Sequence, residues 1–252
     1  MKLHWEIAPE DVEAVHSFLA LHQDDAFVKS RIEKNLREDK PAITKDEFWY
    51  WMVVCLLTTQ QRSGPTSAVT RFSNTTPFPL EYGVCLLQGD MLESFVWQAI
   101  TDFGGLRFGG RIAGELVTNL HYLEGNSGWD QTMSMLEKFR LNQTRESERE
   151  AADIIDDRLD GFGPKQSRNL LQCLGLSRYE VPIDSRIVDW LNEFGFPVRL
   201  SAAALADRNY YHFVSEGYQQ LCKECEVFPC VLDAAIFASS TRAVGHRKSS
   251  LN

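Results

Sequence analysis

The segment Leu159-Asp160-Gly161-Phe162-Gly163-Pro164-Lys165 joins two runs with helical patterns, and it restricts the possible folds more than any other stretch. Residues 148–159 predict one helix. A second helix is predicted to begin at Pro164, with Gly163 as its N-cap. Gly161 and Gly163 can take positive φ angles, and the turn leaves backbone N–H groups uncovered at a helix N-terminus. Such a turn is suited to holding a phosphate group.

Lys165 lies in the first turn of the second predicted helix, where the positive end of the helix dipole disfavours an ammonium. We expect this position, together with partial burial, to lower the proton affinity of Lys165, as a nucleophilic amine requires. Asp184 follows 19 residues later and precedes the amphipathic run 185–191, so it is a candidate N-cap. A reversal at Gly175 and an extended return would bring Asp184 back beside Lys165.

These residues resemble the helix-hairpin-helix DNA glycosylases, a family that includes endonuclease III and the 8-oxoguanine DNA glycosylases. Lys165 and Asp184 match the catalytic Lys and Asp of that family, and the resemblance covers about residues 44–240. It implies an all-α fold with two lobes. Residues 44–175 form a six-helix lobe that ends in the helix-hairpin-helix motif, and residues 1–43 and 176–252 form a second helical lobe from both termini.

The helical patterns elsewhere agree with an all-α chain, since almost no alternating β pattern occurs. The capping box Thr44-x-x-Glu47 opens an apolar helix that ends near Leu57 and is expected to be buried and central. A second capping box, Asp90-x-x-Glu93, predicts another helix through Ile100.

The resemblance also implies contacts to DNA and to the excised base. Gln60 is the candidate for filling the gap left by an extruded base, and Gln61 is its neighbouring alternative; two solvated glutamines at a helix end are the plainer interpretation. The spacing of Arg107-Phe108 and Arg111 is similar to a helix of archaeal-type 8-oxoguanine glycosylases. The predicted DNA-binding residues are Gly161, Phe162, Gly163, Gln60, Gln61 and Arg186, and those of the base pocket are Phe237 and Asn169.

The family pattern and this sequence differ at the base pocket and at the cysteines. The family places a Cys or His four residues after the catalytic Lys, and Asn169 stands there. Endonuclease III relatives hold an iron–sulfur cluster on four C-terminal cysteines, whereas this chain has three in that region, Cys222, Cys225 and Cys230. We therefore expect free thiols, no metal and no cofactor.

Charge and composition limit the class of partner. The net charge of −9 and the pI near 5.2 argue against coating of nucleic acid by bulk charge, but residues 158–186 carry a local excess of basic side chains. No signal peptide or membrane span is evident, so an intracellular location in cytoplasm, nucleoid or nucleus is expected. The expected partner is double-stranded DNA containing a damaged base, bound by a monomer.

The predicted activity is that of a bifunctional DNA glycosylase and AP lyase of base excision repair, with 8-oxoguanine as the favoured base. Two alternatives stay open: a glycosylase for oxidised pyrimidines, and a non-catalytic helix-hairpin-helix DNA-binding protein. A monofunctional glycosylase that activates water through Asp184 is disfavoured by Lys165.

Overall fold

The computed structural model describes residues 4–61, 63–125 and 127–249, and the regular structure within these ranges is entirely helical. The fold is therefore all-α, as predicted. The α-helices are α1 (Pro9–Ala20), α2 (Ala26–Leu36), α3 (Lys45–Leu57), α4 (Ala68–Ser73), α5 (Tyr82–Leu86), α6 (Leu92–Phe103), α7 (Gly109–Glu124), α8 (Gly128–Leu141), α9 (Arg145–Arg158), α10 (Pro164–Cys173), α11 (Ser185–Phe194), α12 (Arg208–Glu224) and α13 (Pro229–Ser249). Two short 3-10 helices, η1 (Gly89–Met91) and η2 (Ala202–Ala206), complete the set.

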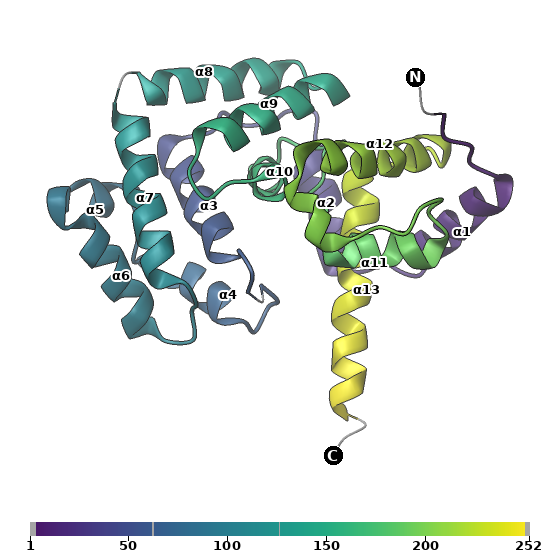
Figure 1. The fold of residues 1–252 in the computed structure, drawn as a ribbon, viewed down its shortest axis with the longest axis horizontal. Coiled ribbons are helices and arrows are strands. Elements are labelled where there is room, and N and C mark those ends of the chain that lie inside the picture. Colours follow the sequence, from purple (N-terminus) through teal and green to yellow (C-terminus); the bar gives the residue numbers. More distant parts are fainter. Residues whose placement is uncertain (1–3, 62, 126, 250–252) are drawn as a thin grey trace.

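The helices divide into two groups, each with its own apolar core (Figure 1). Helices α3 to α9 enclose the first core, and α1, α2 and α11 to α13 surround the second. Both termini thus contribute to the second group, which gives the two-lobed form that the sequence predicts. The lobe boundary between residues 175 and 176 stays a prediction, since Leu176 still packs in the first core.

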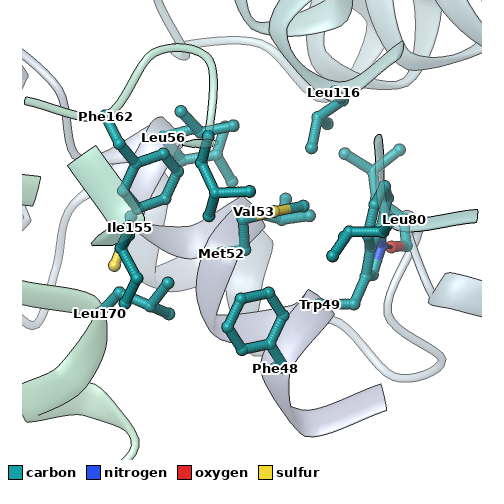
Figure 2. Packing of buried hydrophobic residues seen from close by; sticks show 14 of the residues in the cluster. Phe48, Trp49, Met52, Val53, Leu56, Leu80, Leu116, Ile155, Phe162 and Leu170 are labelled. Atoms are coloured by element: carbon teal, nitrogen blue, oxygen red, sulfur yellow. Dashed lines mark hydrogen bonds between the residues drawn. The ribbon is translucent and has the colours of Figure 1, made fainter. Parts of the chain in front are cut away.

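Helix α3 is the centre of the first core because apolar side chains surround it on every side. Thr44 caps it by accepting a hydrogen bond from the Glu47 amide at 3.1 Å. Phe48, Trp49, Met52, Val53 and Leu56 are fully buried and meet Leu80, Leu116, Ile155, Phe162 and Leu170 from other elements (Figure 2). The C-terminal end of α3 is consequently held rigidly next to α10.

Helix α10 lies between the two groups of helices (Figure 1). It begins at Pro164, and the turn after it uses Gly175 at φ +74° to reverse the chain. The buried ammonium of Lys40 donates hydrogen bonds to the carbonyl oxygens of Gly175 and Asn35, which ties this end of α10 to α2. Both ends of the helix that carries Lys165 are therefore anchored.

Some local features differ from the sequence-based expectations. The capping box predicted at Asp90 does not form; η1 occupies residues 89–91, and α6 begins at Leu92 without a side-chain cap. The short helices α4 and α5 were not predicted. Each has too few residues to show a periodic pattern, and their stability comes from packing of Val69, Phe72 and Cys85 into the first core.

Within the described ranges, no helix combines the length and apolar character that a membrane span requires.

Candidate active site

The turn between α9 and α10 has the predicted hairpin form, but only one of its two glycines takes a positive φ. Gly161 adopts φ +79°, whereas Gly163 is extended at φ −122° and serves as the N-cap of α10. Gly163 is thus the N-cap that the sequence predicts, and of the two glycines Gly161 alone uses a positive φ. Because the first turn of a helix lacks intrahelical partners for its N–H groups, the N-terminus of α10 still offers amide donors.

Helix α7 supports the hairpin through the side chain of Asn119. The Asn119 side chain pairs with the Asp160 backbone: its Oδ1 accepts from the Asp160 amide at 2.7 Å, and its Nδ2 donates to the Asp160 carbonyl at 3.0 Å. Glu115 lies so close to Gly161 that a Cβ there would come within 2.5 Å of its carboxyl carbon. Gly161 is thus required by both its φ angle and its neighbour.

The side chain of Phe162 points into the first core and is only 7% exposed. This residue, predicted to bind DNA, can do so only through its backbone. Its burial explains why the turn is rigid: one aromatic anchor fixes the loop while the flanking backbone stays at the surface.

A cavity of about 370 Å³ lies where the two groups of helices meet, and both Lys165 and Asp184 line it. Its other walls come from α2, α3, α10 and α13 and from residues near these helices. The lining residues are Phe27, Ser30, Arg31, Lys34, Asn35, Trp51, Val54, Thr58, Ser63, Asn169, Gln172, Cys173, Pro182, Arg186, Asp233 and Phe237. The predicted catalytic pair and both predicted base-pocket residues therefore share one cavity.

Asp184 is the N-cap of α11, as expected, and its carboxylate has a second partner. One oxygen accepts from the amides of Arg186 at 2.9 Å and Ile187 at 3.4 Å, and the other is paired with the Arg186 guanidinium. The guanidinium also lies 4.4 Å from the centre of the Phe237 ring, which stacks on Phe27 at 4.6 Å. Arg186 thus orients Asp184 at the cavity wall, and its predicted contact with DNA stays a prediction.

Asn169 is held by sulfur and amide contacts in the wall next to Lys165. Its Nδ2 lies 3.4 Å from the sulfur of Cys55 and 3.3 Å from the Gln166 Oε1. The Cys173 thiol donates to the Asn169 Oδ1 at 3.9 Å. Interaction with the Cys55 thiol lowers the pKa of Cys173, whereas burial raises the pKa of Cys55.

A second lysine, Lys34, lines the same cavity. Its ammonium lies 4.4 Å from the centre of the Trp51 ring, and partial burial lowers its pKa. Lys34 comes from α2 rather than from the hairpin, so it provides a natural comparison for Lys165.

A buried ionic cluster connects the Lys165 helix to the segment that leads to Asp184. Arg168, on α10, is fully buried and donates to Glu180 at 2.9 Å and to Asp153 at 2.9 Å. Arg149 also reaches Glu180, at 3.1 Å. Burial raises the pKa of Glu180, but the two guanidiniums outweigh it, so the net pKa is lower than usual.

Glu148, on α9, fixes the same segment, residues 177–180, which leads from α10 to Asp184 and is called the returning segment below. Its carboxylate accepts hydrogen bonds from the amides of Arg178, Tyr179 and Glu180 at 2.7–2.8 Å and from the Ser177 hydroxyl at 3.1 Å. Burial raises the pKa of Glu148 to about 7, although these hydrogen bonds act in the opposite direction. The placement of Asp184 thus depends on charges buried behind the cavity.

The two glutamines after α3 have different surroundings. Gln61 is occupied: it donates to the Leu57 carbonyl and accepts from the Arg107 amide at 3.0 Å. Gln60 is exposed and takes an unusual left-handed backbone at φ +55°. Of the two candidates, Gln60 has the side chain directed to solvent.

Two arginines flank the aromatic ring at the start of α7. The guanidiniums of Arg107 and Arg111 lie 4.7 and 4.9 Å from the centre of the Phe108 ring. Arg107 also donates to the Gln60 carbonyl at 3.5 Å. The glutamine loop and this basic cluster thus form one surface.

The three C-terminal cysteines, Cys222, Cys225 and Cys230, pack as apolar side chains. All three are buried in the second core, burial raises the pKa of each thiol, and among the described residues no three His, Cys, Asp or Glu side chains converge as ligands. All six cysteines of the chain are free thiols.

The fold of this chain is similar to the folds of solved DNA glycosylase structures. It superposes on the 8-oxoguanine DNA glycosylase of Methanocaldococcus jannaschii with a TM-score of 0.60, 16% sequence identity and coverage of 92% of this chain and 96% of that one. This chain has the fold of the 8-oxoguanine DNA glycosylases. The Thermotoga maritima 8-oxoguanine glycosylase gives a TM-score of 0.62 at 12% identity, covering 90% of this chain and 95% of that one.

A further match is the M. jannaschii 8-oxoguanine glycosylase/lyase in complex with a 15mer DNA containing 8-oxoguanine, with a TM-score of 0.61, 15% identity and coverage of 91% and 97%. No family model matches this sequence, and no curated protein is similar to it in sequence. This chain is therefore similar to the glycosylases in fold rather than in overall sequence.

Several cavity residues of this glycosylase fold were not predicted. They include Lys34, Trp51, Gln172, Cys173 and Asp233. A sequence signal existed for Cys173, which lies eight residues after Lys165 and four after Asn169, on the same helix face. Asp233 likewise precedes Phe237 by four residues. Lys34 and Trp51 come from distant segments, and no spacing rule connects them to the hairpin.

Proposed function

We propose that this chain is a bifunctional DNA glycosylase and AP lyase that excises an oxidised base, with 8-oxoguanine first, and cuts the strand by β-elimination. The observation that carries the proposal is the common cavity of Lys165 and Asp184 beside a helix-hairpin-helix turn. A hairpin that only grips phosphate has no need of an amine and a carboxylate in one cavity next to it.

The chemistry follows from the two side chains. The damaged nucleotide is extruded from the duplex, at a cost of a few kcal/mol, and its base enters the cavity. Lys165 first releases a proton to solvent, and its amine then attacks C1′ as the glycosidic bond breaks; the base leaves with the bonding electron pair and takes up a proton. The ionised carboxylate of Asp184 stabilises the positive charge that develops on the sugar.

The covalent intermediate then undergoes strand cleavage. Ring opening of the sugar gives a Schiff base between Lys165 and C1′. Water takes the C2′ proton, and the 3′ phosphate departs with the electron pair of its bond to C3′, which completes β-elimination. Hydrolysis of the Schiff base then frees Lys165. Arg186 holds Asp184 in place through its guanidinium.

DNA binding is proposed to use three groups of residues. The amides of the hairpin hold the backbone phosphate next to the damaged nucleotide. Gln60, the exposed glutamine, fills the gap left in the duplex, while Gln61 holds the loop through Arg107. Arg107 and Arg111 supply positive charge. Because the chain carries a net charge of −9, only such local contacts attract DNA, so affinity should fall with salt.

Borohydride trapping tests the proposal. The wild-type protein is incubated with duplexes containing an abasic site or 8-oxoguanine, and the Schiff base is reduced to a stable adduct. We expect Lys165→Gln to abolish the adduct and Lys34→Gln, the second lysine of the same cavity, to retain it. An adduct lost in Lys34→Gln but kept in Lys165→Gln would move the nucleophile to α2. No adduct with the wild type would refute the lyase.

The identity of the base is tested on matched duplexes with 8-oxoguanine, thymine glycol or uracil. Release of 8-oxoguanine supports the favoured substrate. Release of a pyrimidine alone would support the alternative of an oxidised-pyrimidine glycosylase and leave the Lys165 chemistry in place.

A further inference from the structure

Helix α13 passes the wall of the cavity and then continues beyond it. Asp233 and Phe237 line the cavity from this helix, and Asp233 is the more deeply buried of the two. The ring of Phe237 lies 4.4 Å from the guanidinium of Arg186, which pairs with Asp184. The chain direction along α13 therefore leads from the interior of the cavity, past the Asp184 wall, to the outside.

The last part of α13 projects from the body of the molecule. The helix continues to Ser249, and its yellow end extends clear of both groups of helices (Figure 1). Helix α4 lies toward the same edge of that view. Residues 241–249 are called the projecting segment below. Because helices in proteins gain most of their stability from packing, a projecting helical segment is suited to a partner that covers it.

Charge distinguishes this part of the chain from the rest. The whole chain has a formal charge of −9, yet no acidic residue follows Asp233. Residues 234–252 contain Arg242, Arg247 and Lys248, together with His246, so their formal charge is +3 with histidine neutral. At about 3.6 residues per turn, these positions are distributed around the helix instead of along one face. Such a distribution suits an extended polyanion better than a single carboxylate.

Stabilisation of the helix itself accounts for only part of this pattern. Cations in the last turn of a helix interact favourably with the negative end of its dipole, which applies to Arg247 and Lys248. Arg242 lies about two turns before the end, beyond the reach of this effect. The sequence also lacks the acidic partners at i,i+4 spacing that support solvated helices. The pattern therefore favours a surface for an anionic partner.

We propose that the projecting segment binds the phosphate backbone of the duplex next to the damaged nucleotide. The inference rests on the proposed function and adds a phosphate-binding surface to it. With the damaged base in the cavity, the DNA backbone lies at its mouth, where α13 emerges. At 1.5 Å per residue, Arg242 and Lys248 lie about 8 and 17 Å beyond Phe237 along the helix axis. Phosphates of one strand are spaced about 3.4 Å along the duplex axis, so the contacts fall about two to five nucleotides from the damaged one.

The salt dependence of DNA affinity tests the inference. In the triple variant Arg242→Gln, Arg247→Gln, Lys248→Gln, the segment loses its three permanent charges. Each phosphate contact contributes about 0.9 to the slope of log K against log salt concentration. For two or three contacts, raising salt from about 50 to 200 mM should cost the wild type about 10- to 40-fold more affinity than it costs the variant. The charge-preserving variant Arg242→Lys, Arg247→Lys should keep the wild-type slope.

A matched control removes three charges elsewhere. Lys138→Gln, Arg199→Gln and Lys223→Gln together alter exposed residues outside the cavity and change the net charge by the same amount. A loss due to net charge alone appears equally in both triple variants. Far-UV circular dichroism checks that each variant keeps its helices. Equal salt slopes for the two triple variants would overturn the inference.

The position of the damaged nucleotide provides a second test. In duplexes of equal length, it is placed in the centre or within about two base pairs of either end. For one of the two ends, the phosphates in reach of the projecting segment are missing, so the wild type and the triple variant should there bind with similar affinity. A difference that persists at both ends would contradict a contact next to the damaged nucleotide.

Borohydride trapping at an abasic site separates this inference from the proposed function. A wild-type protein that forms the adduct, with a salt slope that the triple variant shares, refutes the phosphate contact and leaves the lyase in place. A wild-type protein that shows the expected difference in slope but forms no adduct refutes the lyase and leaves the phosphate contact.

Discussion

The buried pair of Arg168 and Glu180 gives the sharpest test of how the site is held. Replacing Arg168 with Met keeps similar volume and removes the charge, which leaves Glu180 fully buried with Arg149 and Gln219 as its remaining partners. Removing one partner of a buried salt bridge lowers the free energy of unfolding by about 3–5 kcal/mol. Because Glu180 keeps its contact with Arg149, we expect a loss near the lower end of this range, about 3 kcal/mol. For a chain of this size, that corresponds to a fall in Tm of about 6–12 °C.

The effect of pH on this loss has a definite sign. In the wild type the pKa of Glu180 is below its ordinary value, so the ionised group contributes stability above the unfolded pKa, and that stability is lost as pH falls. Without Arg168 the pKa of Glu180 rises, and the buried anion destabilises the fold as pH increases. The deficit of Arg168→Met should therefore be larger at about pH 7.5 than at about pH 5.

Urea unfolding at both pH values measures the deficit. The control is Arg208→Met, which removes a half-exposed arginine paired with Asp156 and Asp157 and should cost less than about 1 kcal/mol. If Arg168→Met lost no more stability than Arg208→Met, or if its deficit did not grow with pH, the buried pair would not hold α10 to the returning segment.

Three further predictions concern the site and its surroundings. Asp184→Asn should slow base excision at least about 100-fold, far more than it weakens DNA binding, because the carboxylate acts on charge of the transition state; equal losses of rate and affinity would make Asp184 a cap alone. Gly161→Ala should lower stability by about 1–2 kcal/mol, measured by urea unfolding, and reduce affinity for abasic DNA, since its Cβ meets Glu115 at positive φ. The purified protein should lack stoichiometric iron and visible cluster absorption, since Cys222, Cys225 and Cys230 are buried in apolar surroundings.

The hairpin could be recognised from sequence because its determinants are local. Pro164 begins α10 and Gly175 ends the reversal after it, and both act through their own backbone preferences. The sequence left the φ angle of Gly163 open, although it predicted the N-cap role. Glycine permits a positive φ without requiring it, and the N-cap position of α10 calls for an extended backbone.

The walls of the cavity could not be predicted in the same way because they depend on tertiary packing. Trp51 looked like one more apolar residue of the central helix, and Lys34 like a solvated residue of an amphipathic one. Only the packing of α2 against α13 and of α10 against α3 brings them together. The pairing of Arg186 with Asp184 was equally hidden, since a basic residue in a DNA-binding region suggests phosphate first.

The support that α7 gives the hairpin has a geometric consequence. Asn119 holds the hairpin backbone, and the N-terminal end of the same helix carries Arg111 next to Arg107 and the Gln60 loop. The ten steps of helix from residue 109 to residue 119 span about 15 Å. Helix α7 therefore fixes the spacing between the hairpin, which we propose holds a phosphate, and the Gln60 loop, which we propose fills the gap in the duplex. DNA that engages both must match this fixed distance, so a duplex that kinks easily will be held better than a stiff one.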